Sequence, residues 1–392
     1  MVKSSRIKIL GAGPTGTLLA IALAEVGSTV NIYDPKNEYE LINRSRSYAL
    51  TQSTRMLLQR LNLWQKIIPI LNPFQRLLVI DDETYNQIDF TCLDLPKDQI
   101  PIEDIGWIVD HNEIMRILLD HIKNHDNISI KFGSLSNSDN NSYELILAAD
   151  GPSSQTRNEL GIKSFAWKYE QACLTAKILL RSASPSTAYE VFRSEGPLAI
   201  LPMGDNIFQI VWSAPFDLCN YRAQLKPSAF LDRLAAVIPA PLEPDLLLDS
   251  PSVYPIRLSI ASKLYKGNCI LVGESAHCCH PVGGQGLNLC LRDVDVLMRL
   301  IRKVNHKSVH VSSIPILYTK NRYIDVFTVC FFTDVLIRFF SNRSFPFVSV
   351  RSFALIILKY FSFLRRNSLG LMTYGPEYLF KLYLNKITKI KT

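Results

Sequence analysis

The fold is decided by the stretch Ile7-Lys8-Ile9-Leu10-Gly11-Ala12-Gly13-Pro14-Thr15-Gly16. Its first four residues predict a short buried strand, and the apolar residues that follow Gly16 recur at helical spacing. A second strand is predicted at 29–33, with Asp34 at its end. A strand, a G-x-G-x-x-G turn, a helix, a second strand and an acidic residue are together typical of a βαβ unit that binds a dinucleotide.

Each residue of this fingerprint has a mechanical role. Gly11 permits the tight turn, Gly13 lets the backbone approach a pyrophosphate, and Gly16 lets the helix lie close to the strand. The amino end of the helix offers unpaired N–H groups and the positive end of its dipole to phosphates. Asp34 is predicted to accept hydrogen bonds from ribose hydroxyls. The fingerprint alone does not distinguish FAD from NAD.

Two further predicted strands lead into motifs that suit the same kind of ligand. The strand at 145–149 runs into Asp150-Gly151-Pro152-Ser153-Ser154-Gln155-Thr156-Arg157, where the Asp150 carboxylate is placed to hold ribityl or ribose hydroxyls. The strand at 269–272 opens onto residues 273–288, after which a helix is predicted. Because Gly283-Gly284-Gln285-Gly286 opens that helix, its N–H groups can face an electron-rich ring.

Taken together, these segments resemble the FAD-dependent aromatic hydroxylases of the p-hydroxybenzoate hydroxylase type, above all the branch that hydroxylates ubiquinone precursors. The third motif of that family, G-D-A-A-H-x-x-x-P-x-x-G-Q-G-x-N-L-G-L-R-D-V, is matched by 273–277, Pro281 and 284–294. Three more segments match in the right order: Arg46-Ser47-Tyr48-Ala49-Leu50, Glu195-Gly196-Pro197-Leu198-Ala199-Ile200-Leu201-Pro202, and Thr333-Asp334 with Phe340-Ser341-Asn342. The chain departs from the family at Glu274, Ser275 and Cys290, where Asp, Ala and Gly are usual.

The resemblance implies bound FAD, with NADH or NADPH as a transient electron donor and molecular oxygen as a second substrate. Together with the fingerprint, it gives a set of predicted cofactor-binding residues: Gly11, Gly13, Gly16, Asp34, Arg46, Arg116, Asp150, Gly151, Gly273, Glu274, Pro281, Gly284, Gln285, Gly286, Leu287 and Asn288. Pro281 matches the family proline that borders the flavin face where oxygen reacts. No base for a phenolic substrate is identified, and His280 and Pro281 are the weak catalytic candidates.

Basic residues concentrate at the end of the chain. The 392 residues carry a formal net charge of +8, and residues 320–392 alone contain 12 Lys or Arg against three acidic residues. This aromatic segment is interrupted by Asp334 and Lys359, so neither apolar stretch reaches the roughly 20 residues of a membrane-spanning helix. Two interpretations stay open: a tail that lies on a membrane surface, or a helical tail packed on the body with solvated charges.

The cysteine pattern bears on location and on metals. The eight Cys are scattered without a disulfide framework, which favours a reducing cytoplasm. Peripheral membrane contact through the tail is the alternative that stays open beside this location. The run His277-Cys278-Cys279-His280 is not expected to bind a metal, because adjacent cysteines rarely serve one tetrahedral site. No nucleic-acid partner is expected, since the charge excess lies in the aromatic tail.

The expected fold class is α/β: a Rossmann-like FAD-binding domain, a middle antiparallel-sheet substrate domain and a helical C-terminal tail. The predicted boundaries are 1–80, 104–165 and 260–315 for the discontinuous FAD-binding domain, 81–103 and 166–259 for the substrate domain, and 316–392 for the helical region. Strands are expected at 199–202 and 207–212.

Three functions are compatible with this architecture. The preferred hypothesis is a monooxygenase that hydroxylates the ring of a small aromatic molecule, a prenylated phenol of quinone biosynthesis. The alternatives are a flavin-dependent reductase of prenyl chains on the same fold and a non-catalytic flavoprotein subunit of a biosynthetic assembly. The intact glycines and Asp150 count against the last of these.

Overall fold

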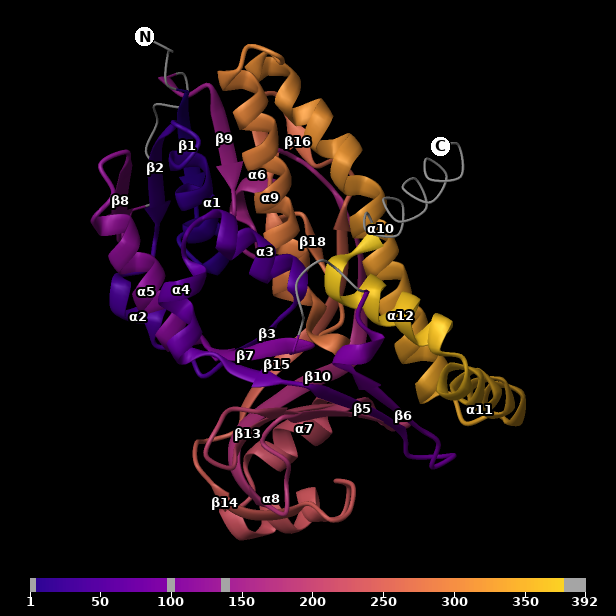
Figure 1. Cartoon of the computed structure of the whole chain (residues 1–392). Coiled ribbons are helices and arrows are strands. Elements are labelled where there is room, and N and C mark those ends of the chain that lie inside the picture. The colour runs from indigo at the N-terminus through magenta and orange to yellow at the C-terminus, as the bar shows by residue number, and fades with distance from the viewer. Residues whose placement is uncertain (1–4, 97–102, 135–141, 377–392) are drawn as a thin grey trace.

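The protein contains two large sheets and a helical C-terminal region (Figure 1). The computed structural model describes residues 5–96, 103–134 and 142–376. Residues 377–392 of the predicted helical region lie outside the described residues, as do 97–102 and 135–141.

The first sheet has six strands and carries the glycine-rich turn. Its order is β16 (Tyr265–Lys266), β17 (Cys269–Leu271), β9 (Leu145–Ala148), β1 (Arg6–Leu10), β2 (Thr29–Asp34) and β8 (Ile128–Phe132). Every pairing is parallel except that of β16 with β17. Ile7 and Ile9 of β1 are fully buried, as expected of a central parallel strand covered on both faces. The four strands predicted for this domain are thereby confirmed.

Helices with apolar faces cover this first sheet. The principal ones are α1 (Pro14–Ala24), α5 (His111–Lys123) and α9 (Gln285–Asn305), and one buried cluster joins their side chains to β1, β2, β9 and β17. Shorter helices complete this part of the chain: α2 (Glu38–Ile42), α3 (Gln52–Arg60), α4 (Trp64–Ile67) and α6 (Gln155–Glu159). A small sheet of β3 (Ser47–Leu50), β7 (Gly106–Asp110) and β4 (Asn72–Phe74) lies between the two large sheets (Figure 1).

The second sheet is largely antiparallel and contains the predicted middle strands. Its order is β18 (His277–Cys278), β15 (Ser252–Ala261), β10 (Ser164–Arg181), β13 (Ile207–Pro215), β12 (Leu198–Pro202), β11 (Thr187–Phe192), β5 (Arg76–Asp81) and β6 (Gln87–Thr91), with β14 (Glu243–Leu247) paired to β10. One face packs on α7 (Phe216–Ala223) and α8 (Pro227–Ala235) in a single buried cluster.

Two details of this sheet bear on the predicted boundaries, which stay a prediction. The sheet takes in β5 from Arg76 onward, before the predicted start at residue 81, because β5 pairs in parallel with β11. It also takes in β18, which pairs with β15 although it belongs to the predicted 260–315 piece. Pairings between distant segments leave no local pattern in the sequence.

The C-terminal region is helical as expected and packs on the rest of the chain. It contains α10 (Ile314–Ser341), α11 (Phe345–Tyr360) and α12 (Ser362–Tyr374). α10 runs beside α9 on the first sheet and continues towards the second sheet, where α11 and α12 follow (Figure 1). The α/β class with a Rossmann-like domain, an antiparallel middle sheet and a helical C-terminal region is therefore confirmed.

Candidate functional site

The glycine loop between β1 and α1 leaves open space beside its middle glycine. Gly11 has a φ of +101°, and a Cβ there would lie 2.3 Å from the Ala149 carbonyl oxygen. A Cβ on Gly16 would lie 1.9 Å from the Gly11 carbonyl oxygen, so the close packing requires glycine at both positions. A Cβ on Gly13 would meet no described atom within 4 Å. Gly13 therefore borders the space at the amino end of α1 that suits a phosphate.

Asp34 fixes this loop from the end of β2. Its Oδ2 accepts a hydrogen bond from the Ala12 N–H at 2.7 Å, and its Oδ1 accepts one from the Lys36 N–H at 2.8 Å. A carboxylate oxygen accepts more than one hydrogen bond, so Asp34 retains capacity for a ribose hydroxyl.

Asp150 presents a carboxylate oxygen that lacks a protein donor. Its Oδ2 accepts a hydrogen bond from the Thr156 N–H at 3.0 Å, whereas its Oδ1 is buried and unpaired among the described residues. Ser154 fixes the intervening turn, because its hydroxyl accepts a hydrogen bond from the Arg157 N–H at 3.0 Å at the start of α6. Leaving a buried acceptor unpaired costs about 1–3 kcal/mol. The geometry therefore suits a ligand hydroxyl at Oδ1.

The second and third motifs are joined through Ser275, one of the departures from the family pattern. Its hydroxyl donates to the Ala148 carbonyl oxygen at 2.6 Å and accepts from the Val272 N–H at 3.0 Å. Arg157 Nη1 donates to the Ser275 carbonyl oxygen at 2.9 Å. The hydroxyl thus ties β9 to the loop after β17.

Glu274 and Arg46 lie on the same side of this loop. Glu274 is half-buried, whereas the Arg46 side chain is exposed to solvent. Desolvation lowers the pKa of Arg46, but Tyr48 and, to a smaller extent, Glu274 outweigh it, so the net direction is upward. The Arg46 guanidinium also lies 5.3 Å from the centre of the Tyr48 ring. The longer side chain of Glu274 is accommodated, and the neighbouring Gly273 adopts a φ of +67°.

Asn288 fixes the turn that opens α9. Its Oδ1 accepts hydrogen bonds from the Thr51 N–H at 3.0 Å, the Thr51 hydroxyl at 3.0 Å and the Thr54 hydroxyl at 2.7 Å. Its Nδ2 donates to the carbonyl oxygens of Ala49 at 2.7 Å and Gly284 at 2.8 Å. Because both ends of the amide are occupied within the protein, the side chain positions the loop.

The Gly283–Gly286 turn is also held by the C-terminal region. Gly283 and Gly284 have φ values of +65° and +62°, a region that favours glycine. Gln285 Nε2 donates to the carbonyl oxygens of Gly283 and of Met372 in α12, each at 3.1 Å. A Cβ on Gly286 would meet no described atom within 4 Å, so this turn too borders open space.

The other predicted cofactor-binding residues differ in their burial and in their distance from the glycine-rich turns. Gly151 follows Asp150 with a φ of +86° and open space beside it, and Leu287 is half-buried in the first turn of α9. Arg116 is exposed on α5, and no contact among the described ranges joins it to the other predicted residues. The structure brings the remaining residues together around the carboxyl ends of β1, β2, β9 and β17, and their contacts with a cofactor stay a prediction.

The weak catalytic candidate His280 is buried and neutral. Burial lowers its pKa to about 3, against a small opposing effect of Asp334. Its Nδ1 accepts a hydrogen bond from the Val282 N–H at 3.2 Å, which places the ring proton on Nε2, where no partner is present among the described residues. So low a pKa disfavours His280 as a base near neutral pH. Pro281 follows it, half-buried, at the start of the Val282–Gly284 turn.

A buried ionic network behind the site was not predicted. Asp293 Oδ2 accepts hydrogen bonds from the Gly273 N–H at 2.7 Å and from His277 Nε2 at 2.8 Å, and its Oδ1 accepts one from Arg322 Nε of α10. Arg322 also pairs with Asp325, which binds Arg292 of α9 at 2.9 Å. The only sequence signal was Arg292-Asp293 within the family motif, which does not identify partners on α10.

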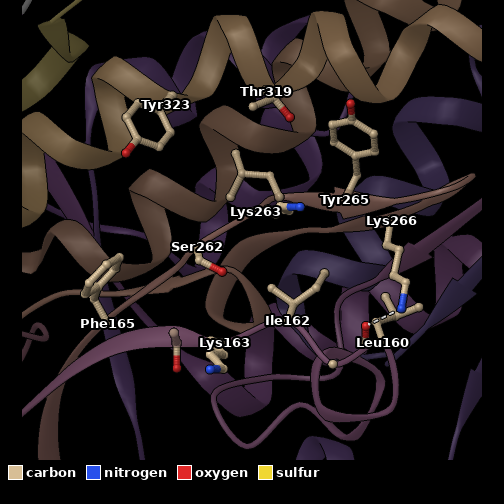
Figure 2. Close-up of a pocket in the computed structure, with 13 residues that line it drawn as sticks. Leu160, Ile162, Lys163, Phe165, Ser262, Lys263, Tyr265, Lys266, Thr319 and Tyr323 are labelled. Atoms are coloured by element: carbon tan, nitrogen blue, oxygen red, sulfur yellow. Dashed lines mark hydrogen bonds between the residues drawn. The ribbon is translucent and has the colours of Figure 1, made fainter.

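A cavity of about 870 Å³ is shown with its lining residues in Figure 2. It is lined by the start of β10, the segment from Ser262 to Lys266 and two residues of α10, Thr319 and Tyr323. Lys163, Lys263 and Lys266 border it, and Lys266 Nζ donates to the Leu160 carbonyl oxygen at 2.8 Å. None of the predicted cofactor-binding residues lines this cavity.

Comparison with known proteins supports the cofactor and the class of reaction. Residues 136–308 match the FAD binding domain family. The chain is 27% identical to the ubiquinone hydroxylase UbiM of Neisseria meningitidis over 367 residues, covering 87% of this chain and 78% of the relative. It is 26% identical to the 3-demethoxyubiquinol 3-hydroxylase of Escherichia coli over 372 residues, covering 87% of this chain and 91% of the relative.

A solved structure shares the fold. HpxO of Klebsiella pneumoniae, in complex with FAD and uric acid, aligns with a TM-score of 0.73 at 16% identity, covering 96% of this chain and 98% of that one.

The described residues fit FAD, the cofactor of this chain. The space beside Gly13 at the amino end of α1 would receive the pyrophosphate, and the unpaired Asp150 Oδ1 would accept a hydrogen bond from a ribityl or ribose hydroxyl. The open turn at Gly284–Gly286 would direct the positive end of α9 at the electron-rich edge of the ring system.

Proposed function

This chain is an FAD-dependent aromatic hydroxylase of the ubiquinone-hydroxylase branch, and from that premise we propose that its substrate is a ring with a long prenyl chain, a precursor of ubiquinone or a related quinone. The electrons come from NADH or NADPH, and the second substrate is molecular oxygen. FAD supplies the redox chemistry, in which one oxygen atom enters the ring and the other is reduced to water.

The residues around the flavin site orient the reactants and exclude water. Asn288 and Gln285 hold the Gly283–Gly286 turn in one conformation, so the amino end of α9 keeps a fixed direction. α12 closes the turn from outside through the Met372 carbonyl oxygen. A closed apolar site favours transfer of oxygen to the ring over its loss to water.

One observation carries the proposal of a lipid-tailed substrate. We call residues 280–286, which lead into α9, the flavin loop. A single buried apolar cluster includes Ala188 and Phe192 of β11, Val282 of the flavin loop, Leu355 of α11 and Leu369 of α12. The side chains that lie between the flavin loop and the middle sheet are thus continuous with the inner side of the C-terminal helices. A prenyl chain that leaves the ring site in this direction would meet apolar side chains throughout.

The outer side of the same helices suits a membrane surface. We define the outer aromatic face by a subset of the exposed apolar residues between Tyr323 and Leu364, from α10, α11, α12 and the break between the last two: Tyr323, Ile324, Phe327, Phe331, Phe332, Phe345, Phe347, Val350, Phe353, Ile356, Tyr360, Phe361, Phe363 and Leu364. Residues 343–374 contain no acidic side chain, and Arg343, Lys359 and Arg366 are exposed among them. Aromatic rings and basic groups on one face favour the surface of an anionic bilayer.

The mode of contact that we propose is peripheral. Among the described residues, no single helix is both long and apolar enough to cross a bilayer. α11 and α12 meet that test only as a pair, and they are bent by 100° at the break between them. The outer aromatic face would therefore lie in the headgroup region, with the ring site beneath it.

Mass spectrometry with labelled oxygen tests the proposal. The purified holoenzyme is incubated with NADH or NADPH, ¹⁸O₂ and a lipid extract from cells that make quinones. We expect one labelled oxygen atom in a prenylated phenol. A product reduced in its prenyl chain without label would instead support the reductase alternative. Turnover of water-soluble phenols far above that of prenylated ones would refute the lipid-tailed substrate but leave the hydroxylase intact.

A further inference from the structure

A buried carboxyl group lies on the face of the middle sheet that is turned to the flavin loop. In β11, Tyr189 and Val191 pack on the cluster under α7 and α8, whereas Ala188 and Phe192 pack on the opposite cluster with Val282. Because side chains alternate along a strand, Glu190 shares the side of Ala188 and Phe192. Glu190 is 8% exposed.

The residues beside Glu190 on this face are small. Glu190 pairs with Ala199 of β12, Ala199 pairs with Val211 of β13, and Val211 pairs with Thr175 of β10. Neighbouring strands lie about 4.8 Å apart, so Glu190 and Thr175 mark the ends of a row about 14 Å long. The Thr175 hydroxyl is buried without a hydrogen-bond partner among the described residues. Two polar groups thus flank a stretch of small apolar side chains, an arrangement suited to an aromatic ring with oxygen substituents.

The flavin loop approaches Glu190 from the other side. Burial raises the pKa of Glu190 to about 7, and the Gly283 backbone opposes this shift by stabilising the carboxylate. Glu190 forms no ion pair with a described residue. The charged groups of neighbouring β5 are engaged elsewhere, Arg76 with Asp89 and Asp81 with Arg351. The Cys173 thiol, whose pKa burial raises to about 12, lies close enough to Glu190 for the carboxylate charge to act on it.

We propose that Glu190 is the catalytic base that accepts the phenolic proton of the ring substrate. The inference rests on the proposed function. The phenol O–H bond breaks, the proton goes to a carboxylate oxygen of Glu190, and the bonding electron pair stays on the phenolate oxygen. No electrons leave the ring in this step. The phenolate has more electron density at its ortho and para carbons, which prepares the ring to receive an oxygen atom.

The chemistry matches the position of the group. An ordinary phenol has a pKa of about 10 and an ordinary glutamate one of about 4.3, which makes the usual carboxylate a weak base for this proton. A carboxylate whose pKa lies near neutral pH is a stronger base for the phenolic proton, and burial against the sheet raises the pKa of Glu190 in this direction. The Gly283 N–H, which belongs to the flavin loop, would hold the carboxylate next to the flavin ring when FAD is bound.

A chromogenic phenol tests the proposal without turnover. The FAD-loaded wild type, Glu190→Gln and the matched control Glu195→Gln are each saturated with a 2-alkyl-4-nitrophenol, whose phenolate absorbs visible light, and titrated with base. Glu195 is an acid of the same domain, paired with Arg222 at 3.0 Å and hydrogen-bonded by Nε1 of Trp212, whose ring packs in the cluster under α7 and α8. We expect the phenolate band to appear at higher pH in the wild type and in Glu195→Gln than in Glu190→Gln, because the Glu190 carboxylate beside the ring oxygen opposes a second negative charge there.

Turnover gives the second measurement. With the labelled product of the lipid extract as readout, Glu190→Gln should lower kcat about a hundredfold and lose the limb of the pH profile near neutrality. Flavin content and the rate of flavin reduction by NADH or NADPH should not change. Glu190→Asp should retain the pH limb at reduced kcat, which a role in holding Gly283 alone would not predict.

The outcomes that overturn the proposal are distinct from those that overturn the proposed function. Three results would each refute the role of Glu190. The first is an identical phenolate titration in the wild type and Glu190→Gln, and the second is a shift of equal size in Glu195→Gln. The third is a probe that binds none of these proteins. Labelled oxygen in the product together with an unchanged pH profile of Glu190→Gln would refute Glu190 alone. Absence of labelled product from the wild type would refute the hydroxylase function itself.

Discussion

His277 Nε2 lies 2.8 Å from Asp293 Oδ2, and both side chains are buried behind the third motif. The same carboxylate oxygen accepts a hydrogen bond from the Gly273 N–H, and the other oxygen pairs with Arg322 of α10. Burial opposes the ionised form of Asp293, but His277 and Arg322 together hold its pKa well below the usual value. One carboxylate therefore links the loop at Gly273, helix α9 and the C-terminal region.

Replacing this carboxylate should loosen all three elements at once. Asp293→Asn leaves the Arg322 guanidinium buried without its principal counter-charge, so we expect a loss of about 3–5 kcal/mol in the free energy of unfolding and weaker retention of FAD. Chemical denaturation and the flavin-to-protein ratio measure the two effects. The wild-type contribution is present above about pH 4 and is lost as the pH falls through the lowered pKa of Asp293.

Asp295 on the same helix provides the control for Asp293. It pairs with Arg60 at 2.8 Å and with Arg299 at 3.2 Å near the surface. Asp295→Asn should therefore change stability by less than about 1 kcal/mol. Equal losses in the two variants would contradict a special role for the buried network.

Two glycines of the fingerprint should respond differently to the same substitution. Gly13→Val adds a side chain that meets no described atom within 4 Å at its Cβ, so the chain should fold but lack FAD, because the side chain occupies the space of the pyrophosphate. Gly16→Val places a Cβ 1.9 Å from the Gly11 carbonyl oxygen and should prevent α1 from packing on β1. Circular dichroism and flavin absorbance distinguish a folded colourless protein from an unfolded one. A yellow Gly13→Val protein would refute this position for the pyrophosphate.

There is a physical reason why some residues of the site could be predicted from the sequence and others could not. The Gly11–Gly16 turn and Asp150 were predicted because their roles depend on local backbone geometry, which a short sequence pattern records. Glu190 was missed because it lies in the strand Tyr189-Glu190-Val191, both faces of which are buried. No local pattern indicates that one of those faces is turned to Gly283. Arg322 was missed for the same reason, since its partner Asp293 is on another helix.

Glu190 should make stability depend on pH in a way that its amide variant does not. Burial raises the pKa of Glu190 from 4.5 to about 7. Between these values the folded chain holds a proton that the unfolded chain has released, so the wild type loses stability as the pH rises through this range. The free energy of unfolding of Glu190→Gln, relative to the wild type, should increase by about 3 kcal/mol over the same range. Denaturation at both ends of the range measures it, and a constant difference would show that Glu190 titrates normally.

The final prediction concerns the outer aromatic face. Removal of the chain from Lys320 onward would not isolate its effect, because Arg322 binds Asp293 and Met372 binds Gln285 inside the fold. Surface substitutions avoid this problem. Phe353 and Phe361 are 65% and 60% exposed, so replacing both with Ser should leave the core intact.

Sedimentation with anionic vesicles measures the consequence. Each fully buried Phe side chain contributes about 1.5–3 kcal/mol, so loss of the two rings should weaken vesicle binding by at least about a hundredfold if both enter the headgroup region. Lys359→Glu with Arg366→Glu should also weaken binding, and added salt should reduce this electrostatic part but not the apolar part. Tyr39→Ser is the matched control, because Tyr39 is 75% exposed on α2, on the side of the molecule opposite α11 (Figure 1). If the Phe353 and Phe361 variant binds vesicles as the wild type does, or if Tyr39→Ser weakens binding equally, the outer aromatic face is not the membrane-contacting surface.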